Sequence, residues 1–181
     1  MKFQDNIKGQ RIALRKMRPE SELAEQLLQV MSRNRESVLT WMAFDEDNII
    51  PKDINHASRI LHNIDTQIKS GLAIYYGIFR KDKFIGFVMA DLYPDRAEPG
   101  SFIDKDYAGK GYVKEARVLL DSELFTNSVI KIVSSVDFEN TPCLHLMHSL
   151  GYKNEGLMPK RHYQKYRKEY RDEYIFSKTK T

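Results

Sequence analysis

The stretch from Asp104 to Ala116 constrains the fold most, because two glycines stand one residue apart at a change of sequence pattern. A strand-like run precedes Gly109 and Gly111, and a helical run follows them. Glycine accepts the backbone conformations of a tight turn and lets the main chain approach a ligand closely. The start of a helix presents unpaired N–H groups and a partial positive charge. This junction therefore predicts a site for a phosphate or pyrophosphate group.

Length and composition are those of an ordinary globular protein. The chain has 181 residues, of which 41% are hydrophobic and 30% charged, and we expect one domain over residues 1–181. No apolar run approaches the ~20 residues of a membrane span, and residues 1–8 contain no apolar signal segment. The single cysteine, Cys143, cannot form an internal disulfide, which fits a cytoplasmic protein. The net charge of +4 fits an anionic cofactor and is not by itself a nucleic-acid signature.

Strands and helices alternate along the sequence. We expect helices where apolar residues recur at helical spacing: after Pro19, over 36–44, over 57–68, over 112–128 and over 143–150. We expect strands over 11–17, 73–79, 84–90, 99–103 and 130–136, and in two pieces of 162–177. Pro99 and Gly100 mark a bulge or an interruption of strand pairing. This order predicts an α/β (α+β) fold around a largely antiparallel sheet.

Four segments carry a resemblance to a known family, over about residues 9–177. They are Gly109-Lys110-Gly111 with Glu115-Ala116, Glu139-Asn140 with Leu150-Gly151-Tyr152, Ala97-Glu98 leading to Phe102-Ile103-Asp104, and Leu39-Thr40-Trp41. In these the chain resembles the GNAT superfamily of acetyl-CoA-dependent N-acetyltransferases, and within it the RimJ/RimL-like branch that acetylates ribosomal-protein N-termini. The resemblance implies the GNAT fold: a splayed, mixed and mostly antiparallel sheet flanked by helices. The sheet would open between the strand ending near Asp104 and the strand 130–136, and admit the pantetheine arm of acetyl-CoA.

Four positions depart from the family pattern. Asp106 stands where the glycine loop often has Gln or Arg, and Ala108 stands where the branch often has Gln or Arg. Cys143 replaces a serine of the branch, and Met147 stands where many members have a tyrosine. The resemblance therefore predicts cofactor binding better than it predicts the residues that transfer protons.

The resemblance implies acetyl-CoA as co-substrate, and no metal. The cofactor-binding residues that it implies are Phe102, Ile103, Asp104, Gly109, Lys110, Gly111, Tyr112, Val113 and Asn140. Backbone N–H groups of residues 109–113 would hold the pyrophosphate, with Lys110 adding charge nearby. The side-chain amide of Asn140 would bind the pantetheine arm. The structural alternatives are a simple tight turn at the glycines and an N-cap at Asn140.

Acetyl transfer requires a base for the amine and a proton for the departing thiolate. In the family pattern several members have a glutamate at the position of Glu98, on the strand beside the cofactor, so the resemblance implies that Glu98 is the base. Its alternative is an exposed strand glutamate in a salt bridge. Asp104 and Asp106 are weaker candidates for the same role. Cys143 takes the place of the branch's serine, which serves as proton donor to the leaving thiolate, so the resemblance implies that role for Cys143. A thiol can donate, though weakly, and the start of a helix can lower its pKa. Its alternative is a buried packing residue.

The acceptor groove is expected between the N-terminal helices and the tyrosine-rich C-terminal hairpin. Trp41 is the predicted substrate-binding residue, and Met42 and Phe44 could line the pocket with it; core packing is the alternative for all three. His145 and His148 stand three residues apart, but no third ligand is evident, so we expect no metal site.

The function predicted from these features is transfer of an acetyl group from acetyl-CoA to a primary amine, by direct attack in a ternary complex. The acceptor could be a protein N-terminus, a polyamine, an aminoglycoside or a metabolite amine, and an exposed sheet edge could support a homodimer. One alternative is a non-catalytic acyl-CoA-binding module. Another is a nucleic-acid-binding protein that uses the basic tyrosine-rich hairpin, although the acids Glu169, Asp172 and Glu173 dilute its charge.

Overall fold

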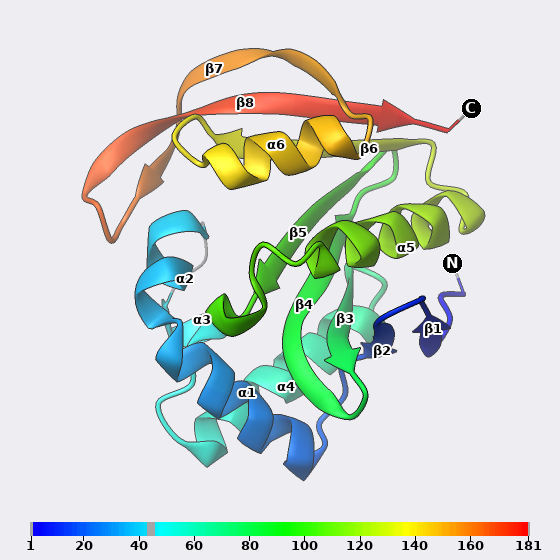
Figure 1. Cartoon of the computed structure of the whole chain (residues 1–181), viewed down its shortest axis with the longest axis vertical. Coiled ribbons are helices and arrows are strands. Elements are labelled where there is room, and N and C mark those ends of the chain that lie inside the picture. The colour runs from blue at the N-terminus through cyan, green and yellow to red at the C-terminus, as the bar shows by residue number, and fades with distance from the viewer. Residues whose placement is uncertain (1, 43–45, 181) are drawn as a thin grey trace.

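A computed structural model describes residues 2–42 and 46–180 of the chain (Figure 1). One mixed sheet has the strand order β1-β2-β3-β4-β5-β6-β8-β7. Its strands are β1 (Asn6–Lys8), β2 (Ala13–Lys16), β3 (Ala73–Arg80), β4 (Lys83–Leu92), β5 (Ala97–Ile103), β6 (Lys131–Asp137), β7 (Lys153–Gln164) and β8 (Glu169–Thr179). The helices are α1 (Ser21–Arg33), α2 (Arg35–Trp41), α3 (Glu46–Ile49), α4 (Ile54–Lys69), α5 (Tyr112–Thr126) and α6 (Thr141–Ser149), with a 3₁₀ turn η1 (Lys105–Tyr107).

The sheet divides where β5 meets β6. All neighbouring strands are antiparallel except these two, which run parallel and share the single register pair Ala97↔Ile132. Beyond that pair β5 and β6 diverge, so β1–β5 form an N-terminal wing and β6–β8 form a C-terminal wing (Figure 1). The predicted fold class, a mostly antiparallel splayed sheet flanked by helices, is confirmed.

Helices cover both faces of the sheet, and alternating side chains of one strand supply both cores. Ile74, Tyr76 and Ile78 of β3 pack on the face covered by α5 and α6. Tyr75 and Phe79 of the same strand pack on the face covered by α1, α2 and α4. Every residue of β3 except the last is buried, as expected for a central strand whose side chains point alternately to two cores.

Several element boundaries differ from those predicted. The C-terminal hairpin begins at Lys153 and not near residue 162, because β7 is an exposed edge strand without an apolar alternation to reveal it. The short elements β1 and α3 were not predicted. No bulge occurs at Pro99 and Gly100, because the register between β4 and β5 is continuous there. What is interrupted is the pairing of β5 with β6, which does not extend beyond Ala97.

Part of one predicted helix, and Phe44 in the predicted acceptor pocket, lie outside the described residues. In the part of the chain that the structure describes, no helix is long and apolar enough to cross a membrane.

Candidate active site

The glycine loop follows β5 and opens α5, as the sequence predicts. Gly109 and Gly111 have φ angles of +72° and +78°, and Gly111 is the N-cap residue of α5. An L-residue in this left-handed region is strained by roughly 1–2 kcal/mol, so the turn requires glycine at both positions. Open space surrounds the position of a side chain at Gly109, and nothing lies within 4 Å of it.

The backbone donors of this loop are unused. Within residues 2–42 and 46–180, the N–H groups of residues 109–113 donate no hydrogen bond. Four such groups are left over at any helix start, and here the glycine turn adds to them. The loop is therefore a row of unpaired donors at the positive end of a 15-residue helix, which is the arrangement that binds phosphate oxygens.

Arg11, for which the sequence predicts no role, binds the carbonyl oxygens of the loop. Its guanidinium donates to the carbonyl oxygens of Lys110 (2.9 Å) and Gly111 (3.2 Å). Glu115 of α5 fixes Arg11 in turn, accepting from its Nε at 2.9 Å and from its backbone N–H at 2.8 Å. Because about 100 residues separate the partners, no local sequence pattern could predict this contact.

Positive charge gathers on the rings of Tyr107 and Tyr112 beside the loop. Cations lie 5.0–6.0 Å from the ring centres: Arg11 and Arg80 at Tyr112, and Lys83 and Lys110 at Tyr107. Lys110 also donates to the carbonyl oxygen of Asp106 at 2.6 Å. The surroundings of the loop therefore favour an anionic ligand.

Asp104, at the end of β5, is fully buried and engaged in structural bonds. Its carboxylate is paired with Arg33 and accepts a hydrogen bond from the Asn34 side chain at 3.0 Å. Burial acts to raise the pKa of Asp104, but the bonds from Arg33 and Asn34 outweigh it and lower that pKa. The oxygens of Asp104 thus bind the junction of α1 and α2, and the role for Asp104 in cofactor binding stays a prediction.

Phe102 and Ile103 point to opposite faces of β5. Phe102 is buried against Phe87 in the core under α1 and α4, with ring centres 5.6 Å apart. Ile103 packs on the side of α5. Both lie beyond the pair Ala97↔Ile132, where β5 has left β6. Their backbone therefore borders the divergence of the two wings.

Glu98 lies one residue past the last pair between β5 and β6. It is half-buried and accepts from the Arg96 Nε at 2.7 Å. In the ladder between β4 and β5 it stands directly opposite Asp91. Burial raises the pKa of Asp91, and the neighbouring charge of Glu98 adds to the effect. The structure thus pairs the predicted base with a second carboxylate that the sequence analysis did not single out.

Asn140 and Cys143 meet at the start of α6. The Asn140 side chain accepts from the Cys143 backbone N–H at 3.2 Å, so the N-cap role is present. The expectation of a lowered thiol pKa is wrong: burial raises the pKa of Cys143, and the charge of Arg117 only partly offsets it. A thiol with a raised pKa remains protonated at neutral pH, as a proton donor must.

Trp41 ends α2 next to the C-terminal hairpin. It is 38% exposed, so core packing does not explain it. The Arg167 guanidinium lies 4.8 Å from the centre of its ring. The Gln164 side chain donates to the carbonyl oxygen of Leu39 at 3.0 Å, which ties the hairpin to α2. Trp41 therefore lies between helix and hairpin, where an acceptor groove was predicted.

The histidines of α6 and two tyrosines of the C-terminal hairpin lie at the surface. His145 and His148 are exposed on α6, and no group of three metal-ligating side chains occurs among the described residues. Tyr163 and Tyr170 stack against each other across the hairpin, with ring centres 5.3 Å apart. Arg171 is buried and paired with Asp137 and Glu139, so its charge is not presented to a nucleic acid.

A splayed sheet whose diverging strand leads through a glycine loop into a helix defines the class of GNAT folds. Residues 11–153 match the family described as "Acetyltransferase (GNAT) domain". Over 180 residues the chain is 34% identical to the "Uncharacterized N-acetyltransferase p20" of Bacillus licheniformis, covering 96% of this chain and 95% of that protein. The chain therefore belongs to the GNAT family, and it is an acetyl-CoA-dependent acetyltransferase.

Solved structures share the fold over nearly the whole chain. The ribosomal-protein-S5-alanine acetyltransferase of Vibrio fischeri has a TM-score of 0.83 and 21% identity, covering 97% of both chains. The microcin C7 self-immunity acetyltransferase MccE, solved with acetyl-CoA and AMP, has a TM-score of 0.83 and 20% identity, covering 94% of this chain and 93% of that one. At 20–21% identity these neighbours show that the fold is shared.

Proposed function

We propose that this acetyltransferase transfers an acetyl group to a primary amine by direct attack in a ternary complex. The main observation behind this proposal is the position of Glu98. It lies where β5 and β6 diverge, at the opposite end of β5 from the glycine loop. A cofactor whose pyrophosphate rests on the N–H groups of residues 109–113 can extend its arm between the diverging strands. Its thioester would then arrive beside a carboxylate.

The proposed chemistry uses two side chains. The neutral amine attacks the thioester carbonyl, forming the N–C bond, and its proton passes to Glu98 directly or through water. The C–S bond then breaks, and the thiol of Cys143 protonates the departing thiolate and is itself reprotonated from solvent. Asn140 would bind the pantetheine amides with the amide nitrogen that its capping bond leaves free.

A groove beside Trp41, at the end of α2, is the proposed site of a large acceptor. The proposed contact with a second subunit is the exposed edge of the sheet. Trp41 would contact a large acceptor such as a protein N-terminus. The other candidate acceptors are a polyamine, an aminoglycoside and a metabolite amine. The edge strand β7 is exposed along nearly its whole length, so a second copy of the chain could pair there.

Binding and turnover test this proposal separately. Calorimetric titration should show saturable binding of acetyl-CoA that Gly109→Trp abolishes, because an indole would occupy the space in front of the loop donors. Gly71→Trp is the matched control: Gly71 also has a positive φ of +73° and open space, but it lies at the end of α4. If acetyl-CoA binds equally to both variants, the loop is not the cofactor site.

Release of free thiol from acetyl-CoA in the presence of amines then tests the base. Glu98→Gln should lower kcat by about 10²–10⁴-fold, the usual contribution of a positioned base, with little change in acetyl-CoA affinity. Asp95→Asn, an exposed carboxylate of the same hairpin, should leave kcat unchanged. Equal rates for wild type and Glu98→Gln would remove Glu98 as the base.

A further inference from the structure

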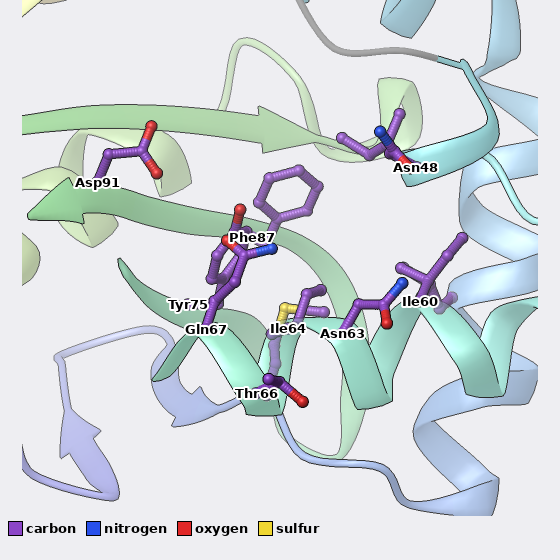
Figure 2. Close-up of a pocket in the computed structure, with 12 residues that line it drawn as sticks. Asn48, Ile60, Asn63, Ile64, Thr66, Gln67, Tyr75, Phe87 and Asp91 are labelled. Atoms are coloured by element: carbon purple, nitrogen blue, oxygen red, sulfur yellow. The ribbon is translucent and has the colours of Figure 1, made fainter. Parts of the chain in front are cut away.

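A cavity of about 440 Å³ lies between α3, α4 and the sheet, on the face of β3 and β4 that α4 covers (Figure 2). Its walls are apolar where Ile60, Ile64 and Phe87 line it. Its polar lining consists of Asn48, Asn63, Thr66, Gln67, Tyr75 and Asp91. The volume is in the range of small-molecule sites, and a few polar groups on apolar walls are typical of them.

Asp91 is the only charged side chain among the described residues that line this cavity. Its carboxylate makes no hydrogen bond or ion pair with any residue that the structure describes, although Asp91 is half-buried. Burial raises its pKa, and Asp91 in turn contributes to raising the pKa of Tyr75 to about 12. A half-buried carboxylate without a partner is costly, and a cationic guest would relieve that cost.

The end of the cavity at Asp91 adjoins the candidate base. Asp91 and Glu98 are directly opposite in the antiparallel ladder of β4 and β5, so their side chains share a face and their Cβ atoms are about 5 Å apart. Glu98 already pairs with Arg96, whereas Asp91 has no such partner. In Figure 2 Asp91 lies at one end of the cavity, and Asn48 and Ile60 lie at the other.

We propose that this cavity is the acceptor pocket and that Asp91 binds the ammonium group of a small aliphatic diamine, whose second amine is acetylated at Glu98. The inference rests on the proposed acetyl transfer and names its substrate class. The ammonium at Asp91 keeps its proton throughout. The other amine, in its neutral form, makes the N–C bond to the thioester carbonyl and gives a proton to Glu98. The C–S bond then breaks, and the CoA thiolate leaves with a proton from Cys143.

The neutral amides around the cavity fit this substrate. Asn63 and Gln67 stand one turn apart on α4, and Thr66 lies between them. Their oxygens can accept hydrogen bonds from an ammonium group, and none of them brings a competing positive charge. The pocket is closed on its sides by helix and sheet, and therefore suits a compact molecule better than an extended peptide.

The test is calorimetric titration of 1,4-diaminobutane into the full-length protein saturated with CoA. Wild type should bind the diamine, and Asp91→Asn, which keeps the size of the side chain, should weaken binding at least tenfold. Asp95→Asn, an exposed carboxylate of the same hairpin, should bind as wild type does. 1-Aminobutane, which carries one ammonium group where the diamine carries two, should bind more weakly than the diamine to wild type.

Kinetics supply a second readout. With 1,4-diaminobutane as acceptor, Asp91→Asn should raise KM and change kcat little, whereas Glu98→Gln should lower kcat. Equal diamine affinity in wild type and Asp91→Asn would overturn the assignment. So would a KM that responds to Trp41→Ala but not to Asp91→Asn, which would place the acceptor at α2.

Failure of the diamine assignment and failure of acetyl transfer remain distinguishable. Acetyl-CoA affinity, measured on the same samples, reports the cofactor site alone. Normal acetyl-CoA binding with thiol release on a peptide amine, and no diamine binding, would refute the diamine pocket and leave the enzyme standing. Absence of acetyl-CoA binding would refute the proposed function itself.

Discussion

Asp104 lies in the segment that resembles the family's cofactor-binding strand, but its side chain makes structural contacts. It closes the strand that leads to the glycine loop, and its side chain is buried against Arg33 and Asn34. Asn34 also accepts from the Lys105 backbone N–H at 3.0 Å through its other amide atom. One buried carboxylate and one buried amide thus join the junction of α1 and α2 to the entrance of the loop.

Removal of this carboxylate should destabilise the protein. Asp104→Ala leaves Asn34 with an unpaired buried donor and removes the partner of Arg33, so we expect a loss of about 1–3 kcal/mol in the free energy of unfolding. Urea unfolding measures it. Asp106→Ala, an exposed aspartate two residues on, is the control and should change stability by less than about 0.5 kcal/mol. Equal effects would show that the buried pair contributes nothing specific.

The same carboxylate makes stability depend on pH in a defined direction. The folded pKa of Asp104 lies below its ordinary value of 3.8, so its contribution is present above that value and is lost as the pH falls through the folded pKa. Wild type should therefore lose stability more steeply below pH 4 than Asp104→Asn does. Parallel stability curves for the two proteins between pH 5 and pH 2.5 would contradict this assignment.

Cys143 makes a prediction about reactivity. Because burial raises its thiol pKa, the thiolate that reacts with alkylating agents is scarce at neutral pH. We expect iodoacetamide to modify Cys143 of the folded protein at least tenfold more slowly than a free cysteine thiol at pH 7.5, as followed by mass spectrometry. Unfolding in urea should restore the ordinary rate. Rapid modification of the folded protein would show an accessible, activated thiol.

At the scale of elements, the glycine loop depends on a strand turn far away in the sequence. Arg11 follows β1 and precedes β2, and it reaches the loop carbonyls of Lys110 and Gly111 while Glu115 holds it. When the carbonyl oxygens of these peptide units are held on one side, their N–H groups are directed to the other. The turn between β1 and β2 therefore supports the proposed cofactor site, although it need not touch the cofactor.

Arg11→Ala should therefore weaken acetyl-CoA binding while leaving the fold intact. We expect an increase of about tenfold in Kd, which corresponds to about 1.4 kcal/mol, because the loop must be ordered on binding. Arg15→Ala is the matched control: Arg15 lies on β2 and pairs with the exposed Asp82. Calorimetry on both variants decides the matter, and equal Kd values would show that the loop needs no support from Arg11.

Periodicity and short motifs allowed some of these elements to be predicted from the sequence. The buried strands β3 and β4, the amphipathic helices α1 and α4, and the positive-φ glycines at 109 and 111 were predicted because local chemistry determines them. The edge strand β7 was missed over residues 153–161 because an exposed strand carries no apolar alternation. Arg11 and Asp91 were missed because their importance comes from partners that only the fold supplies.

At the scale of the whole molecule, two wings meet through very little backbone pairing. β5 and β6 share the pair Ala97↔Ile132, whereas β4 and β5 pair over seven positions and β6 and β8 over seven. Each wing has its own ion pair with a buried carboxylate, Asp104 with Arg33 in the N-terminal wing and Asp137 with Arg171 in the C-terminal wing. A cofactor between β5 and β6 would therefore add contacts where the two strands have little backbone pairing of their own.

Binding of acetyl-CoA should consequently stabilise both wings together. At a concentration 100-fold above Kd, a ligand that binds only the folded state adds about 2.7 kcal/mol. For a chain of this size that corresponds to a rise in Tm of roughly 5–10 °C. Gly71→Trp should show the same rise, and Gly109→Trp should show none, although both replace a glycine of positive φ.

Hydrogen exchange identifies where that stabilisation acts. If the arm of acetyl-CoA lies between the wings, amide protection should increase in residues 104–113 of the N-terminal wing's loop and also in residues 132–143, which include β6 and the start of α6. A ligand held at the glycine loop alone would protect only the first segment, because nothing would then connect it to the C-terminal wing. Protection confined to residues 104–113 would therefore contradict a cofactor arm between β5 and β6, even if the Tm rises as expected.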